Sequence, residues 1–193
     1  MKKLLALILA GAMLFAFAAC GGNETPEAGS DDTAVKVDAA DATDLLTKVW
    51  ETFGEDEKPF VMGGYNETMV DGAPGKFDVS LVEDLDAMLG IPAANVAQID
   101  DAASVIHAMN ANTFTAACYH LAADVDAAAF VDALKANIQA RHWMCGIPEK
   151  LLVVKVGDYV VSAFGAADIV DNLSAKIATV YNVAEVVVDE PIA

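Results

Sequence analysis

Hydrophobic residues recur at helical spacing in four stretches of the chain, and this periodicity predicts four helices. Asp41 stands before the first stretch and Gly54 after it, as an N-cap and a stop signal would. Residues 80–83 (Ser-Leu-Val-Glu) fit a capping box for the second helix, and Gly90 fits its C′ position. Asp124 is the expected cap of the third helix. The apolar faces are Leu45, Leu46, Val49, Trp50 and Phe53 in the first helix, Leu85, Met88 and Leu89 in the second, Ala127, Phe130, Val131, Leu134 and Ile138 in the third, and Ile169, Val170, Leu173, Ile177 and Val180 in a fourth over 166–181.

Strand signals lie between and after the later helices. Residues 102–109 fit a strand or a short helix almost equally, and we interpret them as a strand that pairs with 113–122. The glycine-rich stretch 60–76 predicts a long loop with a short strand near 60–62. Further apolar, β-branched runs predict strands at 151–156, 159–164 and 184–188, with a hairpin turn at Gly157-Asp158.

From residue 113 onward the predicted order is strand, helix, strand, strand, helix, strand, which is the order of a ferredoxin-like split βαβ fold. Right-handed crossovers would place both of these helices on one face of the sheet. We therefore predict an α+β fold with a ferredoxin-like core of four to five mostly antiparallel strands, and two N-terminal helices packed outside this core. Residues 42–193 are enough for a single domain with one hydrophobic core.

The N-terminal segment has the features of a lipoprotein signal peptide. Lys2 and Lys3 form a basic head, and the apolar run that follows at 4–16 is too short to cross a bilayer as a helix, which takes ~20 residues. Small residues then precede Cys20, an order that resembles the bacterial lipobox, in which the cysteine is acylated and becomes the new N-terminus. We therefore expect a signal peptide over 1–19 and a lipid on Cys20. The alternative is an ordinary secreted protein in which Cys20 is incidental.

Residues 20–41 predict a disordered tether between this lipid and the folded domain. The segment is rich in Gly, Ala, Asp, Glu, Thr and Ser and shows no apolar periodicity. A flexible coil of ~20 residues spans ~25 Å. The sequence thus indicates a domain held at the extracytoplasmic face of a bacterial cell membrane by membrane lipid.

The excess of acidic residues excludes nucleic acid as a partner. The formal net charge is −18, and removing Lys2 and Lys3 with the signal peptide leaves 9 basic and 29 acidic residues, or 9 − 29 = −20. Such a chain cannot neutralise phosphate groups, and anionic lipid headgroups repel it, so membrane attachment depends on the lipid at Cys20. The excess favours solubility; alternatively, it attracts cations or a basic partner.

Three segments of the later half resemble a known family. Residues 108–113 (Ala-Met-Asn-Ala-Asn-Thr) lead into a strand, a helix over 125–140 follows, and residues 154–161 (Val-Lys-Val-Gly-Asp-Tyr-Val-Val) form a hairpin. These motifs are similar to those of an uncharacterised family of lipoproteins from Gram-positive bacteria, domain of unknown function 4358, over about 41–181. The chain departs from the family pattern at 142–148, where the family is more polar. The resemblance implies a lipoprotein, and it implies no activity, cofactor or catalytic residue.

Two cysteines and two histidines, in Cys118-x-His120 and His142-x-x-Cys145, make up the ligand set of a zinc site. The predicted topology argues against such a site, because the third helix returns the chain to the start of the strand that contains Cys118. At ~3.3 Å per residue, the first pair then lies roughly 16–23 Å from the second, too far for zinc ligation or for a Cys118–Cys145 disulfide. We expect no metal site and two free, buried thiols.

Arg141, His142 and Trp143 form a candidate partner-binding patch, because Arg and Trp are frequent in binding hot spots. Alternatively, Trp143 covers the bottom of the core after the third helix. His107 is expected to be a partly exposed polar residue beside the 102–122 hairpin.

No catalytic motif is present. The chain has no G-x-S-x-G elbow, no H-E-x-x-H pair and no G-x-x-x-x-G-K-[ST] loop. The acidic clusters at 55–57 and 100–101 lack the calcium-loop pattern and are expected to be solvated or to cap helices. We expect no catalytic, metal-binding or cofactor-binding residue, and predict a non-catalytic, lipid-anchored module that binds a partner or assists assembly at the cell envelope. The alternatives are an envelope hydrolase, which would show a pocket with a histidine and an acid within ~3 Å of each other, and a thiol or metal protein.

Overall fold

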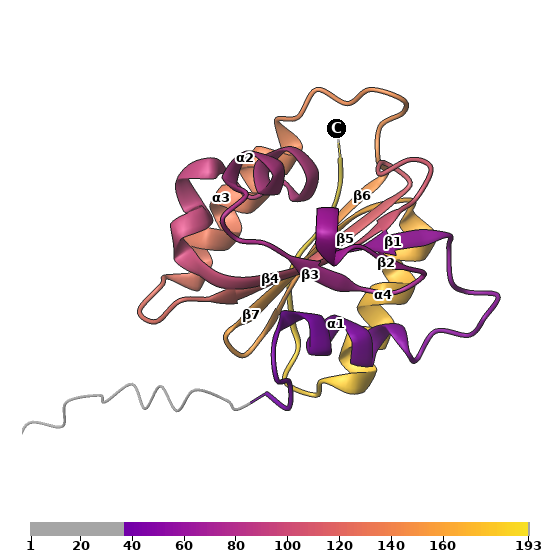
Figure 1. Cartoon of the computed structure of the whole chain (residues 1–193), viewed down its shortest axis with the longest axis horizontal. Helices are drawn as coiled ribbons and strands as arrows, with labels where there is room; N and C mark the ends of the chain where they lie inside the picture. Colours follow the sequence, from indigo (N-terminus) through magenta and orange to yellow (C-terminus); the bar gives the residue numbers. More distant parts are fainter. Residues whose placement is uncertain (1–36, 193) are drawn as a thin grey trace, which may run out of the picture. The chain divides into compact units, whose positions relative to one another are not determined.

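The structure, a computed structural model, describes residues 37–192, and it confirms an α+β fold. An antiparallel eight-stranded sheet forms the middle layer, and helices cover both of its faces (Figure 1). The predicted signal peptide, Cys20 and most of the predicted tether lie outside the described residues. In chain order the elements are α1 (Ala42–Trp50), β1 (Val61–Gly63), η1 (Asn66–Thr68), β2 (Val70–Asp71), β3 (Gly75–Phe77), α2 (Val82–Asp84), the π-helical turn η2 (Leu85–Leu89), η3 (Ala93–Gln98), β4 (Ile99–His107), β5 (Phe114–Leu121), α3 (Ala127–Gln139), β6 (Lys150–Val156), β7 (Tyr159–Gly165), α4 (Ala167–Val180) and β8 (Glu185–Pro191).

The strand order differs from the ferredoxin-like prediction at the last strand. The order is β2-β1-β4-β5-β7-β6-β8, with β3 also paired to β4. β5, α3 and β6 form a split βαβ unit with β7 between the two strands, as predicted. β8 then pairs with β6, whereas a ferredoxin-like sheet would place it beside β5. β4 occupies that position, because residues 99–107 form a strand that pairs with β5, as we interpreted them.

The helices lie on both faces of the sheet, so the prediction of helices on one face is wrong. β7 runs antiparallel to β5, and both crossovers move the chain in the same direction across the sheet, from β5 to β6 and from β7 to β8. Right-handed crossovers that start from strands of opposite direction and move the same way leave the sheet on opposite faces. α3 therefore covers one face and α4 the other (Figure 1).

α1 and α4 share one face of the sheet and one hydrophobic core. Asp41 caps α1 as predicted, because its carboxylate accepts a hydrogen bond from Asp44 N at 2.7 Å. Asp101 on β4 adds a second acceptor, 2.9 Å from Ala42 N. The apolar stripe of α1 is buried against the sheet, so this helix is part of the core and does not pack outside it.

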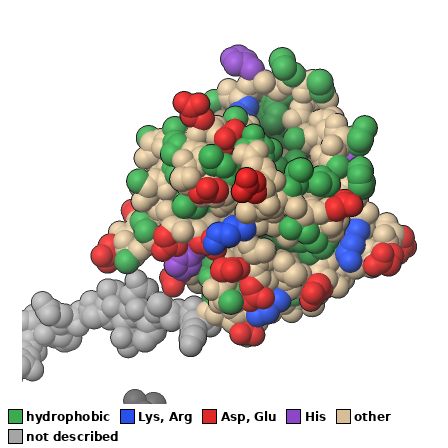
Figure 2. Space-filling view, viewed as in Figure 1, with side chains coloured by type: hydrophobic (Ala, Val, Ile, Leu, Met, Phe, Trp, Pro, Cys, Tyr) green, Lys and Arg blue, Asp and Glu red, His purple; other side chains and the backbone are tan. Residues whose placement is uncertain are grey.

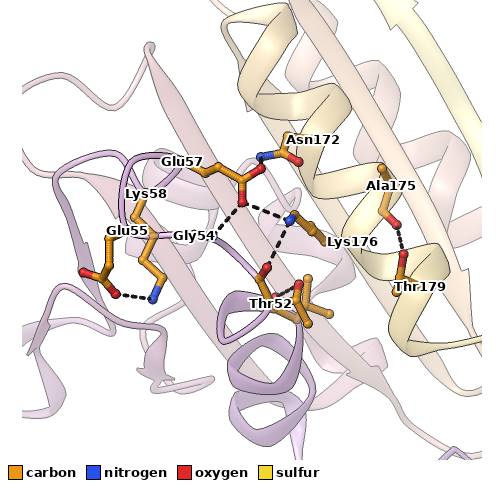
Figure 3. Close-up of polar contacts among 10 residues, drawn as sticks. Thr52, Gly54, Glu55, Glu57, Lys58, Asn172, Ala175, Lys176 and Thr179 are labelled. Carbon is orange, nitrogen blue, oxygen red and sulfur yellow. Dashed lines mark hydrogen bonds and ion pairs between the residues drawn. The ribbon is translucent and has the colours of Figure 1, made fainter.

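Polar contacts join the segment after α1 to α4 (Figure 3). Glu57 accepts a hydrogen bond from Gly54 N at 2.6 Å and pairs with Lys176 Nζ at 2.9 Å. Lys176 Nζ also donates to the carbonyl oxygen of Thr52 at 2.9 Å and lies 5.5 Å from the centroid of the Phe53 ring. The lysine therefore anchors this turn to the helix surface.

The second predicted helix is short and lies on the opposite face, with α3, where it too forms part of the core. It comprises α2 and η2, and Gly90 ends it with φ 84°, as predicted for its C′ position. The predicted capping box at 80–83 is absent. Leu81 is the N-cap residue, and its side chain makes no cap hydrogen bond within the described part of the chain.

The cap of α3 is Asp126 and not Asp124. The Asp126 carboxylate accepts hydrogen bonds from Ala128 N and Ala129 N at 3.0 and 3.2 Å. Asp124 lies two residues earlier in the left-handed region, with φ 64°. The chain therefore makes one further turn before the helix begins.

The glycine-rich stretch 60–76 contains three short strands where one was predicted. β1 and β3 both pair with the same side of β4, and their backbones approach closely at Gly63 and Gly75. A Cβ on Gly63 would lie 2.1 Å from the carbonyl oxygen of Ala73 and 2.3 Å from Gly75 N. The absence of side chains is what allows both strands to pair with β4.

The sheet has two distinct ends. At the loop end, residues 108–113 connect β4 to β5 and residues 140–149 connect α3 to β6. The entry end lies opposite the loop end. There Asp101 of β4 stands opposite His120 of β5 in the strand register, and α1 begins. Residues 37–41, which were predicted to belong to the tether, contact the domain there: Ala40 N donates to Asp44, and Val37 packs against the core.

The β5–β7 ladder connects the two halves of the sheet. Strands β1 to β5 come from the first part of the chain and β6 to β8 from the last part. Within residues 37–192, the pairing of Phe114–His120 with Tyr159–Gly165 is the one ladder between these two groups. Both hydrophobic cores nevertheless take residues from each group.

Candidate binding pocket

Two loops meet at the loop end of the sheet. Asn110 Nδ2 donates to the carbonyl oxygen of Cys145 at 3.2 Å. Asn112 Nδ2 donates to the carbonyl oxygens of Met144 and Gly146 at 2.5 and 2.7 Å. These bonds hold the loop after α3 at the start of β5. The predicted topology placed the loop there, because α3 returns the chain to the start of that strand.

A pocket of about 300 Å³ opens between these loops, η2 and the ends of β4 and β7, and its volume is at the small end of the range for ligand pockets. The structure brings the three residues of the predicted patch into its wall together. The other wall residues were missed, because nothing in the sequence indicates that η2 and the end of β7 meet there. The lining residues are Ala87, Met88, Ile106, Ala111, Asn112, Arg141, His142, Trp143, Met144 and Phe164.

Arg141 is fixed in the wall by hydrogen bonds and aromatic rings. Its Nη2 donates to the carbonyl oxygen of Asp86 at 2.7 Å and to that of Ala87. Its guanidinium carbon lies 5.4 Å from the centroid of the Trp143 ring and 5.7 Å from that of Phe164, within the range of cation–π contacts. Burial lowers the pKa of Arg141, but an arginine remains protonated at physiological pH. Among the described residues, its Nη1 and Nε have no hydrogen-bond partner.

Trp143 fits both alternatives that the sequence left open. Its ring packs against Phe164 at a centroid distance of 5.2 Å and covers the core on the α3 face, and it also lines the pocket. Its indole Nε1 is buried and has no hydrogen-bond partner within the described part of the chain. Leaving a buried donor unpaired costs ~1–3 kcal/mol. An apolar side chain could cover the core without this cost, so the unpaired indole N–H lowers the stability of the domain.

Exposed apolar side chains lie on the two loops that form part of the pocket wall. Met144, which lines it, is 81% exposed, and Met109 and Ile147 on the two loops are 80% and 64% exposed. His142 is also exposed. Hydrophobic side chains gather at the top and right of Figure 2, and the loop between α3 and β6 lies at the top of the same view in Figure 1. Clustered exposed apolar groups are typical of interaction sites.

The two cysteines among the described residues lie in different environments. Cys118 is buried in the middle of β5, opposite Ala103 and Val161, and burial raises the pKa of its thiol. Cys145 is exposed in the loop after α3, so the expectation of two buried thiols is wrong for this residue. Among the described residues, neither thiol forms a disulfide. Within residues 37–192, no group of three or more His, Cys, Asp or Glu side chains is arranged to hold a metal ion.

Several acidic residues outside the pocket form helix caps or ion pairs, and two of the histidines bind neighbouring groups. Asp101, which caps α1, lies 3.1 Å from Lys76 Nζ. Asp100 Oδ1 lies 2.5 Å from His120 Nδ1 at the entry end of the sheet. That distance meets one requirement of the hydrolase hypothesis, but the pair lies away from the pocket at the loop end. His107 is partly exposed, as expected, and its Nδ1 accepts hydrogen bonds from two backbone N–H groups of the following turn.

Comparisons of this chain with protein-family models, with curated proteins and with solved structures find no match. In the described part of the chain, no helix is both long and apolar enough to cross a membrane. The pocket and the residues that form it are therefore the structural basis for a functional assignment.

Proposed function

We propose that this protein is a lipid-anchored, extracytoplasmic binding protein that holds its partner in the pocket formed by Arg141, His142 and Trp143. It is a non-catalytic module of the bacterial cell envelope, akin to the uncharacterised lipoprotein family that its motifs resemble. The observation that carries the binding function is the pocket itself, in which an arginine and a tryptophan stand among exposed apolar residues.

The lipid anchor is supported by the order of residues before Cys20: a basic head, a short apolar run and small residues. Mass spectrometry of the protein isolated from its native membrane tests it. We expect a mature chain that begins with a diacylated Cys20. An unmodified N-terminus, or a start at another residue, overturns this part of the proposal.

The position of the pocket suits a tethered binding protein. Residues 37–41 join the domain at the entry end of the sheet, and the pocket lies at the loop end. Along β5, from His120 to Phe114, these ends are ~20 Å apart. A tether attached at the entry end therefore leaves the pocket open to partners.

Photo-cross-linking in intact cells tests the binding function. A photoreactive residue at His142 in the pocket is compared with the same residue at Asp158, which is exposed in the turn at the entry end. We expect a discrete cross-linked species from position 142 alone, and we expect it to disappear in Trp143→Leu. Identical cross-linking from both positions, or none from position 142, contradicts the proposal.

A hydrolase is the second candidate, and the His120–Asp100 pair is the observation that favours it. In this case His120 would act as a general base oriented by the carboxylate. Hydrolysis of ester or amide substrates by the purified protein, abolished by His120→Asn and retained in Trp143→Leu, would support this candidate over the binding function.

A further inference from the structure

We infer that the pocket binds a carboxylate carried on a small apolar or aromatic group, with Arg141 as the partner of the carboxylate. This inference rests on the proposed binding function and adds the chemical class of the ligand. Two kinds of ligand have this chemistry: a free amphipathic acid, and the C-terminal end of a peptide whose last residue is apolar.

The charge of the pocket differs from that of the chain. The chain has 29 acidic residues, yet none of those within residues 37–192 lines the pocket, and Arg141 is the one permanently charged residue among the described lining residues. Within residues 37–192, Arg141 and Lys155 are the basic side chains without a carboxylate within 4.0 Å. The other lysines all have one: Lys48, Lys58, Lys76, Lys135, Lys150 and Lys176.

The guanidinium retains donors for such a ligand. Of its five N–H groups, those on Nη2 are used by the carbonyl oxygens of Asp86 and Ala87. The N–H groups on Nη1 and Nε have no partner among the described residues. A carboxylate oxygen on Nη1 would form a charge-assisted hydrogen bond without displacing the bonds that fix Arg141.

The rest of the wall selects an apolar body of limited size. Met88, Ile106 and Trp143 present sulfur, hydrocarbon and aromatic surface, and the volume of about 300 Å³ suits one ring or one branched side chain. Among residues 37–192, no lysine and no second arginine line the pocket. A doubly charged phosphate would be poorly compensated there, so the site favours a carboxylate.

NMR titration of the ¹⁵N-labelled full chain carrying Cys20→Ser tests this inference. The chain has two tryptophans, whose indole N–H groups serve as reporters: Trp143 lines the pocket, and Trp50 Nε1 donates to the carbonyl oxygen of Gly72 at 2.9 Å. The probes are N-acetyl-L-phenylalanine, its amide, acetate, phenyl phosphate and a short peptide ending in phenylalanine.

We expect N-acetyl-L-phenylalanine to shift the Trp143 signal saturably and to leave Trp50 unchanged. The amide and acetate should each bind ~10-fold more weakly, because the amide lacks the carboxylate and acetate lacks the aromatic group. Tighter binding of the peptide than of the acetylated amino acid would identify a chain terminus as the source, and the reverse would identify a free acid. Equal affinity for acid and amide, preference for phenyl phosphate, or no saturable shift at about 10 mM overturns the inference.

Variants add an independent check. Arg141→Gln should remove the preference for acid over amide, whereas Lys58→Gln, which loses the same charge at a surface ion pair, should retain it. If Arg141→Gln fails to fold, the affinities of the parent chain for the acid and the amide still decide whether the pocket recognises a carboxylate. If acid and amide do not bind while Trp143-dependent cross-linking at position 142 persists, the ligand class is wrong and the binding function stands. If the cross-linking is absent as well, both are wrong.

Discussion

Gly63 and Gly75 lie where two backbone segments meet with no room for a side chain. Gly63→Ala would place a Cβ 2.1 Å from the carbonyl oxygen of Ala73, so β1 or β3 would have to leave β4. We expect this variant to lower the free energy of unfolding by more than ~2 kcal/mol, as measured by urea denaturation.

Gly72→Ala is the matched control for this substitution. Gly72 has φ 71°, and no atom of residues 37–192 lies within 4 Å of the position that an added Cβ would take, so alanine adds backbone strain without a clash. A cost of ~1 kcal/mol is expected. Equal costs for the two variants would contradict the close approach of the two strands.

Single positions in the pocket could be predicted only in part from the sequence. Arg141 and Trp143 were recognised as a patch because their residue types are frequent in binding sites. Phe164 was predicted only as part of a strand, since its contact with Arg141 depends on the end of β7 reaching the loop after α3. Cys145 was expected to be buried because it is a cysteine, but the Asn110 and Asn112 hydrogen bonds hold its loop at the surface.

The N-terminus of α3 offers a test of one helix cap. Asp126→Ala removes the acceptor of two backbone N–H groups and should lower the free energy of unfolding by ~1 kcal/mol. Asp124→Gly should cost little or nothing, because glycine tolerates the φ of 64° found there. If thermal denaturation shows a larger loss of stability for Asp124→Gly than for Asp126→Ala, then Asp124 and not Asp126 is the cap of α3.

The contact between Glu57 and α4 predicts that the stability contributed by the Glu57 carboxylate depends on pH. The hydrogen bond from Gly54 N and the pairing with Lys176 lower the pKa of Glu57 below its ordinary value of 4.5. Because the folded-state pKa is lowered, the stabilisation is complete above pH 4.5 and is lost as the pH falls through the lowered pKa.

We therefore expect Glu57→Gln to reduce the thermal midpoint at pH 7 and the difference from the parent chain to shrink below pH 4.5. Glu55→Gln is the control, since Glu55 is exposed and pairs with Lys58 at 3.7 Å. A difference for Glu57→Gln that is constant from pH 7 to pH 3 would show that the carboxylate has no part in this contact.

Local patterns predicted the elements better than their arrangement. The 3.6-residue period identified α1, α3 and α4, and the β-branched runs identified β6 to β8, because each signal lies within one short segment. The choice of partner for β8 depends on competition between β4 and β8 for the free edge of β5, which no local pattern records. That choice is also what moved α4 to the face opposite α3.

The acid excess acts on the molecule as a whole. At a net charge of −18, repulsion among surface carboxylates opposes the compact state, and added salt screens it. We expect the thermal midpoint at pH 7 to rise by roughly 2–4 °C as NaCl increases from about 10 to about 150 mM.

Glu67→Lys provides the control for this prediction, because Glu67 is exposed and the substitution makes the net charge two units less negative. Its salt-dependent rise should be smaller than that of the parent chain. A midpoint that falls with added salt would show that the ion pairs outweigh the repulsion.

The β5–β7 ladder has a consequence for how the protein is made. A nascent chain that has reached only Leu121 carries β5 with a row of unpaired backbone groups along one edge, a surface that pairs readily with other strands. The ribosome must add α3, β6 and the turn at Gly157 before β7 can cover that edge. Release of the chain before that point yields an aggregation-prone fragment and not a smaller stable domain.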